Sequence, residues 1–451
     1  MDSLDIDKCD PEIAKFHAYW KRNREIIEGA RVVVPNAANY LTREPAMSDA
    51  QFSNYAKRVP FNPAASSTHE KLMGLVMRSA PVITCPDNSR DILETITAQG
   101  FTIEDLVEDI FHERFVTNYT GLLTDYPTAP KGISAAQAVL LGYRPMVAMY
   151  RAESILEIST ATVTNRQRVV RVRLLDDKNT VRELRLDNGV YSIIIHRNND
   201  GQWLADEPII PTRQGKPLDE IPFTLDSTSR NFLPVNAPLG HLVDLNISHY
   251  VASANLATEM YYSTVRIFVT GGLKNDVAAN LPAYSGARWN FEDREVEREI
   301  LSASDNVISD LREECTTLEH KMAIHGLRML EGDSSSNIST ETQRIRDNAQ
   351  HASLAAIVRG VDRSTNDQLK WISYWMGLEE DAITYETPTD FGAMPMTAQD
   401  IAERRNLWQA GAISRDEFLR MIQSELSEDF DPELDKQKIA EDMADRPTTE
   451  L

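Results

Sequence analysis

The sequence predicts a mixed α+β protein that is mainly helical. Over several long segments, apolar side chains recur at steps of three and four residues, which is the period of an amphipathic helix. A central stretch instead contains short runs rich in β-branched residues, separated by turn residues. With 451 residues, 42% of them hydrophobic and 26% charged, the chain is long enough for more than one core and has the composition of an ordinary soluble protein.

The N-terminal part, residues 11–137, is predicted to be mostly helical. Apolar residues repeat at helical spacing in segments 12–27, 69–77 and 103–119. His112 lacks the HExxH spacing of a zinc site, so we expect it at a surface position of its helix.

The period then changes to that of a β-sheet. Four β-rich runs cover residues 146–150, 169–175, 181–186 and 190–196, with Asn, Asp and Gly turns between several of them. We therefore expect an antiparallel meander within residues 143–235, between the helical N-terminal part and the first long helix.

Two long amphipathic helices are predicted next, over residues 238–264 and 302–330. The first has an apolar and aromatic stripe and contains no Lys or Arg. The second has apolar residues at heptad spacing, which indicates a helical neighbour. The side chains expected to pack on these two stripes are Leu242, Tyr250, Leu311, Leu318 and Met322.

Between the two helices, residues 265–301 are predicted to form a small strand-and-turn tip that contains Arg288, Trp289 and Phe291. After the second helix, residues 331–340 form a polar loop, followed by a third helix with many small residues over 341–378. Residues 379–451 read as a short strand, a helical hairpin and an acidic, apolar-poor end. The polar loop consists of Gly332, Asp333, Ser334, Ser335, Ser336, Asn337, Ile338 and Ser339.

Several motifs follow one another in an order that covers nearly the whole chain. They are Tyr19-Trp20 with Arg24, VPFN at 59–62, LMG at 72–74, PLGHLVDLNISHY at 238–250, EHKMAIHGLRML at 319–330, ETQR at 341–344 and GAIS at 411–414. In this order they resemble the portal proteins of tailed bacteriophages. The chain is most similar to a portal-like family of phage and prophage genomes that is catalogued as a domain of unknown function.

The resemblance implies a ring-forming subunit with a wing, stem, clip and small crown. Residues 1–237 and 341–378 would form the wing, 238–264 and 302–330 the stem, 265–301 the clip, 331–340 a tunnel loop, and 379–451 the crown and an acidic tail. The resemblance further implies a ring of about twelve such subunits. The residues themselves favour a ring, because stem stripes that cannot be buried within one subunit favour a head-to-tail contact that closes.

By the same resemblance, the ring would lie at one capsid vertex of a virion, after synthesis in the host cytoplasm. Double-stranded DNA would pass through it without sequence-specific binding, and the tunnel loop would face that DNA. The terminase, a head-tail adaptor and the major capsid protein would be its protein partners. Arg288, Trp289 and Phe291 are the candidate docking residues, since aromatic and Arg side chains are common interface anchors; a locally packed tip is the alternative.

The net charge of −22 argues against tight phosphate binding, which needs Lys and Arg. An acidic wall would suit a channel, because it does not trap sliding DNA. The alternative is that the acidic surface only keeps the protein soluble. No run of about 18 apolar residues occurs and the start of the chain is acidic, so neither a membrane segment nor a signal peptide is expected.

The sequence shows no catalytic motif: GxxxxGK[ST], GxGxxG and GxSxG are all missing. Cys9, Cys85 and Cys315 are too far apart in sequence for a CxxC metal clamp. A dense acidic region could hold a two-metal nuclease, but a solvated helix face is favoured. We therefore expect no enzymatic activity, no cofactor and no metal. This acidic region contains Asp91, Glu94, Glu104, Asp105, Glu108 and Asp109.

Two other interpretations remain. One is a monomeric or dimeric α+β hydrolase with an unrecognised active site, which predicts a concave pocket with convergent polar groups in one chain. The other is a different virion assembly factor, such as an adaptor or scaffold-like protein, which would form a smaller ring or none. The oligomeric mass distinguishes all three.

Overall fold

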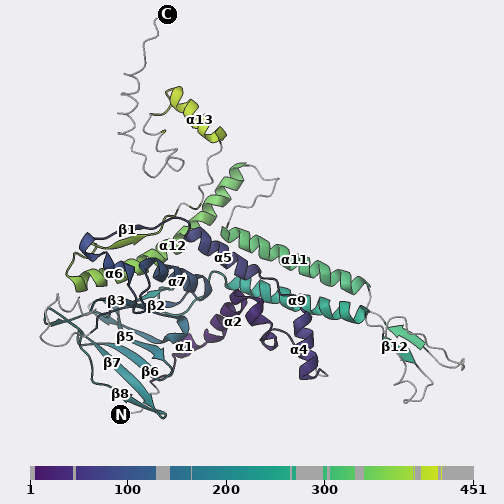
Figure 1. Cartoon of the computed structure of the whole chain (residues 1–451), viewed down its shortest axis with the longest axis horizontal. Helices are drawn as coiled ribbons and strands as arrows, with labels where there is room; N and C mark the ends of the chain where they lie inside the picture. The colour runs from purple at the N-terminus through teal and green to yellow at the C-terminus, as the bar shows by residue number, and fades with distance from the viewer. Residues whose placement is uncertain are drawn as a thin grey trace, which may run out of the picture. The chain divides into compact units, whose positions relative to one another are not determined.

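The computed structural model describes residues 6–43, 47–127, 143–163, 165–264, 267–270, 298–301, 305–330, 340–389, 391, 398–414 and 418. The chain forms two compact units, Met1–Thr389 and Asp390–Leu451. Helices and strands both occur and helices predominate, which confirms the predicted α+β, mainly helical class. Figure 1 shows the first unit as a body that contains most of the strands, from which a pair of long helices extends.

The N-terminal part is helical, as its periodicity predicts. Ser48 and Thr102 begin two of its helices with capping boxes, in which each hydroxyl and the side chain three residues later satisfy free backbone N–H groups. The helices are α1 (Pro11–Ala14), α2 (His17–Glu28), α3 (Ala30–Val33), α4 (Asp49–Arg58), α5 (Ala64–Val76), α6 (Asp91–Glu94) and α7 (Ile103–Val116).

The largest sheet is a five-stranded antiparallel meander in the order β4-β5-β6-β7-β8. Its hairpins turn at Asn188-Gly189 and Asp200-Gly201, where all four residues have positive φ angles, as a two-residue turn of this hand requires. The strands are β4 (Ile155–Val163), β5 (Arg166–Asp177), β6 (Thr180–Asp187), β7 (Val190–Asn199) and β8 (Gln202–Ala205).

A second, three-stranded antiparallel sheet has the order β11-β2-β3. It contains β2 (Thr120–Asp125), β3 (Met146–Tyr150) and β11 (Phe223–Asp226). The expectation that run 146–150 belongs to the meander is therefore wrong. Strand β2 lies in a segment expected to be mostly helical, because its apolar run continues directly from the buried end of α7.

The remaining strands form small antiparallel pairs. Strand β1 (Val82–Thr84) pairs with β14 (Thr384–Glu386), β9 (Thr212–Arg213) with β10 (Lys216–Pro217), and β12 (Ile267–Thr270) with β13 (Arg298–Leu301). Asn366 holds β14 through two hydrogen bonds, one accepted from the Tyr385 N–H at 2.9 Å and one donated to the Tyr385 carbonyl at 2.8 Å.

The main core lies between α1, α2 and the sheets. Trp20 has no solvent exposure, and its ring stacks on that of Tyr119 at a centroid distance of 5.5 Å. Other buried members are Ile13, Leu123, Tyr150, Ile155, Val172, Leu174, Leu184, Tyr191 and Phe223. Half-buried Trp371, Tyr374 and Trp375 pack against the same core, so the C-terminal end of α12 (Thr340–Met376) is anchored in the body.

An ion-pair network fixes α2 to α7. Arg24 donates to both carboxylate oxygens of Glu113 at 2.7 Å and to both oxygens of Glu153 at 2.8 and 2.9 Å. The Glu113 side chain is 1% exposed. A buried carboxylate without such a partner would strongly destabilise the fold, which gives Arg24 a structural role.

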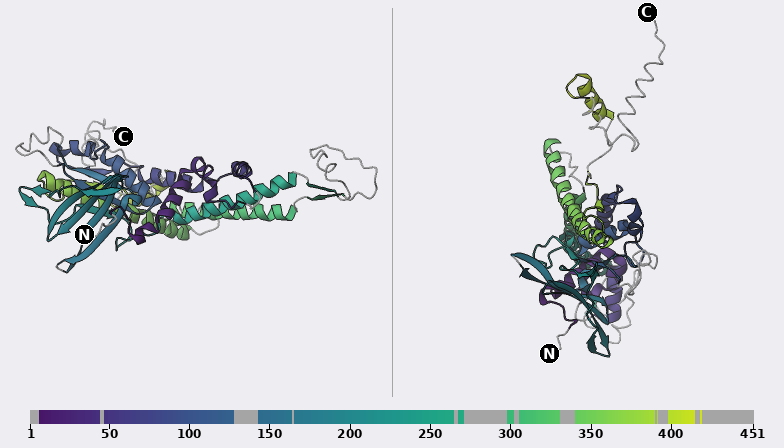
Figure 2. Two further views of the ribbon diagram at one scale, coloured as in Figure 1. Left: turned by 90° about the horizontal axis from the view of Figure 1, so that it is seen from below. Right: turned by 90° about the vertical axis from the view of Figure 1, so that its left-hand side faces the viewer.

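The two long helices are α9 (Gly240–Thr264) and α11 (Asp305–Leu330). They run side by side away from the body toward β12 and β13, as two views agree (Figures 1 and 2). We call α9 and α11 together the two-helix arm.

In the second unit, Asp390–Leu451, the described helix is α13 (Ala398–Gln409). The rings of Trp408 and Phe418 stack there at a centroid distance of 5.3 Å.

Candidate functional site

We call the part of the two-helix arm nearest the body, which contains Asn246 and Tyr250, its inner part, and the part nearest β12 and β13 its outer part. The inner part is bound to the body by hydrogen bonds and ring packing. Asn246 of α9 accepts a hydrogen bond from the Ala65 N–H at 3.0 Å and donates one to the Asn62 carbonyl at 2.9 Å. The ring of Tyr250 is fully buried and meets Phe61 edge-on at 5.5 Å. Helix α9 therefore packs against segment 59–63 and the start of α5.

Helix α11 is seated on α5 and α9. A Cβ atom at Gly326 would lie 2.9 Å from the Thr68 hydroxyl, so glycine permits the close approach of α11 to α5. Between α9 and α11, the rings of His241 and His325 meet at 4.5 Å, and His249 Nε2 lies 3.1 Å from Glu319 Oε1. These contacts attach α11 to both α5 and α9, so the inner part of the arm and the body pack as one.

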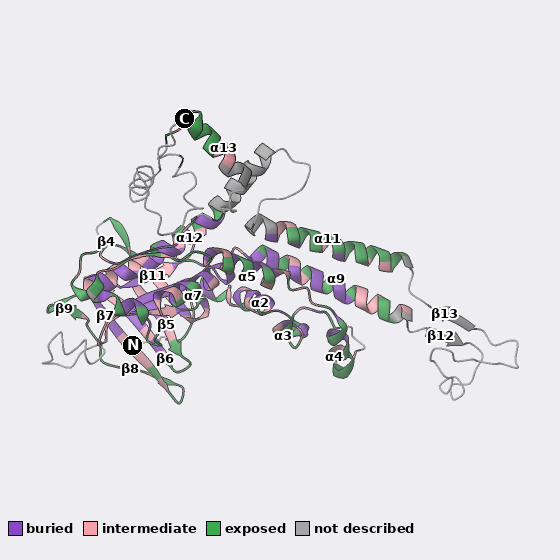
Figure 3. Ribbon diagram, turned by 45° about the horizontal axis from the view of Figure 1, so that its top comes forward, coloured by how far each residue is buried: buried purple, intermediate pink, exposed green. Residues whose placement is uncertain are grey.

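Burial decreases along α9 toward β12 (Figure 3). Leu242 and Val243 near the start of the helix are 2% and 0% exposed, whereas Met260 and Tyr261 near its end are 42% and 44% exposed. On α11, Val307 is 44% exposed. Exposed large apolar side chains of this kind are typical of a surface that another protein covers when they lie together.

A cavity of about 750 Å³ lies beside the outer part of the arm, between α9, α11 and the segment that joins α4 to α5. Phe61, Leu256 and Met260 supply apolar walls. The guanidinium of Arg58 lies 3.9 Å from the centroid of the Tyr261 ring, a cation–π contact that fixes this ring at the rim.

The arm is acidic. Helix α9 contains Asp244 and Glu259 and no Lys or Arg, and α11 contains five acidic residues against three basic ones. The acidic residues of α11 are Asp305, Asp310, Glu313, Glu314 and Glu319, and the basic ones are Arg312, Lys321 and Arg328. A surface with this balance does not bind DNA phosphates tightly.

The expected packing residues take two kinds of position. Tyr250, Leu242 and Met322 are 0%, 2% and 2% exposed, and Leu311 and Leu318 are half-buried. The expectation that the arm stripes cannot be buried within one subunit is wrong for the inner part, because α5 and segment 59–63 cover α9 there. For the outer part, the same expectation agrees with the exposed side chains of Met260, Tyr261 and Val307.

The other predicted site residues fall outside the described residues. This applies to the three tip residues Arg288, Trp289 and Phe291. It also applies to the whole polar loop from Gly332 to Ser339, that is Gly332, Asp333, Ser334, Ser335, Ser336, Asn337, Ile338 and Ser339.

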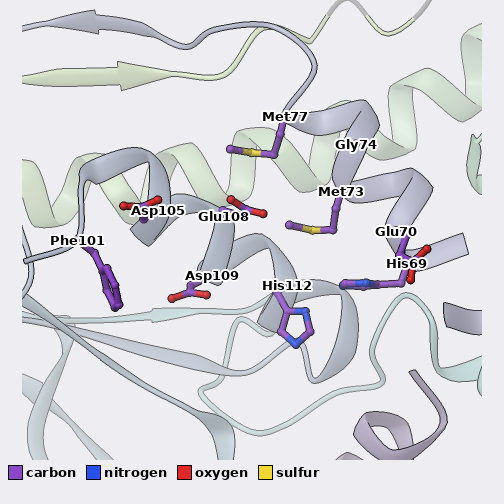
Figure 4. A pocket seen from close by; sticks show the side chains of 10 residues that line it. All are labelled: His69, Glu70, Met73, Gly74, Met77, Phe101, Asp105, Glu108, Asp109 and His112. Carbon is purple, nitrogen blue, oxygen red and sulfur yellow. The ribbon is translucent and has the colours of Figure 1, made fainter. Parts of the chain in front are cut away.

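The candidate acidic region divides into two parts. Asp105, Glu108 and Asp109 of α7 line one cavity together with His112. Asp91, Glu94 and Glu104 do not line this cavity. The expected surface position of His112 is wrong: its half-buried ring meets that of His69 at 4.8 Å (Figure 4). No three His, Cys, Asp or Glu residues in the described part of the chain are placed to hold a metal ion.

The described residues show no activated cysteine nucleophile. Cys9, Cys85 and Cys315 are free thiols, and burial raises the pKa of Cys9 to about 11, so this thiol is protonated at neutral pH. Among the helices of the described ranges, none combines the length and apolar character needed to cross a membrane.

The sequence did not predict three polar features. They are the Arg24–Glu113–Glu153 network, the His69–His112 contact, and the pair of hydrogen bonds that Asn246 makes with Ala65 and Asn62, which we call the Asn246 clamp. Asn246 gave a usable signal, because an amide within an apolar helical stripe must find buried partners. The other two join residues that are far apart in sequence, and no local pattern marks such pairs.

Comparison with known proteins gives one match to a sequence family. Residues 238–376, just under a third of the chain, match the family described as "Domain of unknown function (DUF4055)". This segment contains the two-helix arm, β12, β13 and α12. No curated protein matches the chain significantly.

Three solved structures show a distant likeness. A chain in the neck of an empty gene transfer agent (GTA) particle, with C6 symmetry, is 14% identical over 80% of this chain and 90% of its own length, with a TM-score of 0.42. A chain in the virion of a native GTA particle is 12% identical over 86% and 98%, with a TM-score of 0.41. A chain in a native GTA neck with C12 symmetry is 14% identical over 87% and 99%, with a TM-score of 0.38. Because these scores are below 0.5, the likeness is too weak to assign a shared fold. The chain is thus similar to one family of undefined function over its arm and α12.

Proposed function

We propose that this chain is a portal protein, the structural subunit of a ring at one capsid vertex of a tailed-phage-like virion. The observation that carries the proposal is the two-helix arm, which joins the body at one end and the β12–β13 pair at the other and leads on to the 37-residue helix α12. This order supports the stem, clip and wing that the sequence resemblance implies.

Ring formation follows from the uneven burial of the arm. Its inner part is covered within the chain, whereas Met260, Tyr261 and Val307 on its outer part are exposed. A neighbouring copy that contacts this outer part head-to-tail would bury these side chains, and repetition of that contact closes into a ring. The sequence resemblance implies about twelve copies.

The charge of the arm suits a channel for DNA. In a ring of such subunits, the acidic residues of α9 and α11 would produce a negative potential along the axis. Phosphates would then slide past the wall during packaging and ejection without being bound. In this arrangement the loop from Gly332 to Ser339, which contains no Lys or Arg, faces the duplex.

The proposed partners follow the same geometry. The terminase and later a head-tail adaptor would dock at segment 265–301, with Arg288, Trp289 and Phe291 as anchors. The wing would contact the major capsid protein. The packaging ATPase and nuclease would belong to another protein, and this chain would act as a structural component.

The test is the mass of the purified full chain, measured by native mass spectrometry and followed by negative-stain imaging of the same fraction. We expect a ring of about twelve subunits with a central hole. A compact dimer would contradict the proposal and favour the hydrolase hypothesis. A smaller closed ring would favour an adaptor-like assembly factor. If the chain is monomeric, the measurement is repeated with the capsid protein of the same phage or prophage, and failure to form rings there contradicts the proposal.

A further inference from the structure

A second cavity lies on the body, between α5 and α7. Its volume is about 650 Å³, within the range of about 300–1,000 Å³ that ligand sites occupy. Figure 4 shows that α5 contributes His69 and Met73 to one side, with Met77 directly after its end, and that α7 contributes Asp109 and His112 to the other. It is distinct from the two-helix arm, and the proposed function does not use it.

His69 is a buried polar group without a partner. The residue is 8% exposed and lines the cavity, and its Nε2 atom has no hydrogen-bond partner among the described residues. Burial and the neighbouring His112 lower the pKa of His69 to about 4, so the ring is neutral at pH 7. A neutral imidazole has one nitrogen that can accept a hydrogen bond, and an unpaired buried group of this kind is destabilising.

The walls of the cavity carry negative charge only. Four carboxylates line it and no Lys or Arg does. Among the described ion pairs, none involves Glu70, Glu108 or Asp109, and burial raises the pKa of Asp109. The lining carboxylates are Glu70, Asp105, Glu108 and Asp109.

Two cations act on the cavity from outside its lining, and both are already paired. Arg24 and Arg151 influence His112 electrostatically. Arg24 is held by Glu113 at 2.7 Å, and Arg151 lies 3.6 Å from the same carboxylate. Apart from Asp105, whose side chain belongs to the capping box of α7, the lining carboxylates therefore remain available to a cation that enters the cavity.

The apolar side chains of the cavity wall favour a cation that carries an aliphatic stem and a flat charged group. Met73 and Met77 line the α5 side, and Phe101, which is 49% exposed, stands at the rim. Thioethers and an aromatic face pack against an aliphatic stem and a flat guanidinium. A hard metal ion would use neither, and no three His, Cys, Asp or Glu among the described residues are placed to hold a metal ion.

We propose that the cavity between α5 and α7 binds an arginine side chain presented by a partner protein. The guanidinium pairs with Glu108 and Asp109, one of its N–H groups donates to the unpaired Nε2 of His69, and the stem lies along Met73 and Met77. The open rim at Phe101 and Glu70 leaves room for the backbone of the partner on either side of the arginine.

The test is methyl NMR of the full chain labelled with ¹³C at its methionine methyl groups, with Met73→Leu and Met77→Leu variants to assign the two cavity signals. The probes are the peptide Ac-Ala-Ala-Arg-Ala-Ala-NH₂, the same peptide with citrulline in place of arginine, spermidine, and zinc chloride. We expect the arginine peptide to shift both cavity signals in a saturable way. We expect the neutral citrulline peptide to bind at least about tenfold more weakly, because it loses the charge-assisted pairs.

A matched pair of variants tests the proposed contact. Glu108→Gln removes a lining carboxylate, and Glu104→Gln makes the same change on α7 outside the cavity. We expect Glu108→Gln to weaken the arginine peptide by about tenfold and Glu104→Gln to change it by less than about twofold. Both variants keep their thermal midpoint, because a surface substitution has a small effect on stability.

Four outcomes would overturn the proposal. Equal binding of the citrulline peptide means an apolar pocket without cation selectivity, and binding of spermidine as tight as that of the arginine peptide means a site for free amines. A response to zinc alone means a metal site. No shift with any probe means that the cavity is not a binding site.

Discussion

The inner and outer parts of α9 are built from the same kinds of residue but have different surroundings. Tyr250 is 0% exposed, whereas Tyr261, eleven residues later on the same helix, is 44% exposed. Around Tyr250, segment 59–63 and α5 cover the helix and Asn246 clamps it. Around Tyr261, the described residues beside the arm include α11, Arg58 and the edge of a cavity, and the ring stays 44% exposed.

This difference separates two roles that one apolar stripe cannot distinguish in sequence. The inner part of the arm stabilises the fold of one chain. The outer part is left with exposed apolar area that a partner can cover. If this interpretation is right, substitutions at the inner part change stability, and substitutions at the outer part change assembly.

The largest expected effect is that of Tyr250→Ala. Removal of a fully buried aromatic ring next to Phe61 leaves a cavity, and the expected loss in the free energy of unfolding is about 3–5 kcal/mol. Tyr250→Phe is the control: the hydroxyl has no hydrogen-bond partner among the described residues, so its removal is neutral or stabilising. Urea denaturation followed by circular dichroism measures both. A Tyr250→Ala protein as stable as the wild type would contradict the inner part's assigned role.

Asn246→Ala is expected to have the next largest effect. It leaves the buried Ala65 N–H and the half-buried Asn62 carbonyl without their partners. The buried N–H alone costs about 1–3 kcal/mol, and the carbonyl, which water can reach, costs less. Ser248→Ala, at an exposed position of the same helix turn, is the matched control and should change stability by less than about 0.5 kcal/mol. Equal effects of the two variants would show that the clamp does not hold α9.

The body beside the arm also predicts a pH signature. The folded-state pKa of His69, about 4, lies below the unfolded value of 6.5, so the unfolded state binds more protons between these values. The contribution of neutral His69 is therefore complete above pH 6.5 and is lost as the pH falls toward 4, on the order of 3 kcal/mol in all. Asp362, whose pKa burial raises to about 6, acts in the opposite direction, because its contribution is lost as the pH rises through that value.

His69→Phe isolates the first contribution. We expect this variant to lose less stability than the wild type between pH 6.5 and pH 4.5, measured by urea denaturation at each pH. His320→Phe, an exposed position on α11, is the control and should leave the pH dependence of stability unchanged. If the free energy of unfolding of His69→Phe varies with pH in parallel with that of the wild type, His69 does not cause the pH dependence. That result would also weaken the case for a neutral imidazole in the cavity.

The sequence predicted the long elements well and their surroundings poorly. Apolar periodicity and caps placed α9, α11 and α12 within three residues, because each is long and its pattern is strong. The assignment of 146–150 to the meander was wrong, since period-2 alternation marks a strand but does not identify its partner. Likewise, the stripe on α9 showed that Tyr250 and Tyr261 face one side, yet only the folded chain shows that segment 59–63 covers the first and leaves the second exposed.

The smallest effect on the stability of the single chain, and the sharpest test of the comparison, is expected for Tyr261→Ala. Its ring loses a cation–π contact with Arg58, worth about 0.5–1 kcal/mol at an exposed site, while little buried area is lost. The same substitution removes an aromatic side chain from the surface that a neighbouring copy is proposed to cover, and such anchors dominate interface energies. We therefore expect the ring fraction, measured by native mass spectrometry at fixed protein concentration, to fall much more than the unfolding midpoint. If Tyr261→Ala assembles like the wild type, the outer part of α9 is not an interface and the ring contact must lie elsewhere on the chain.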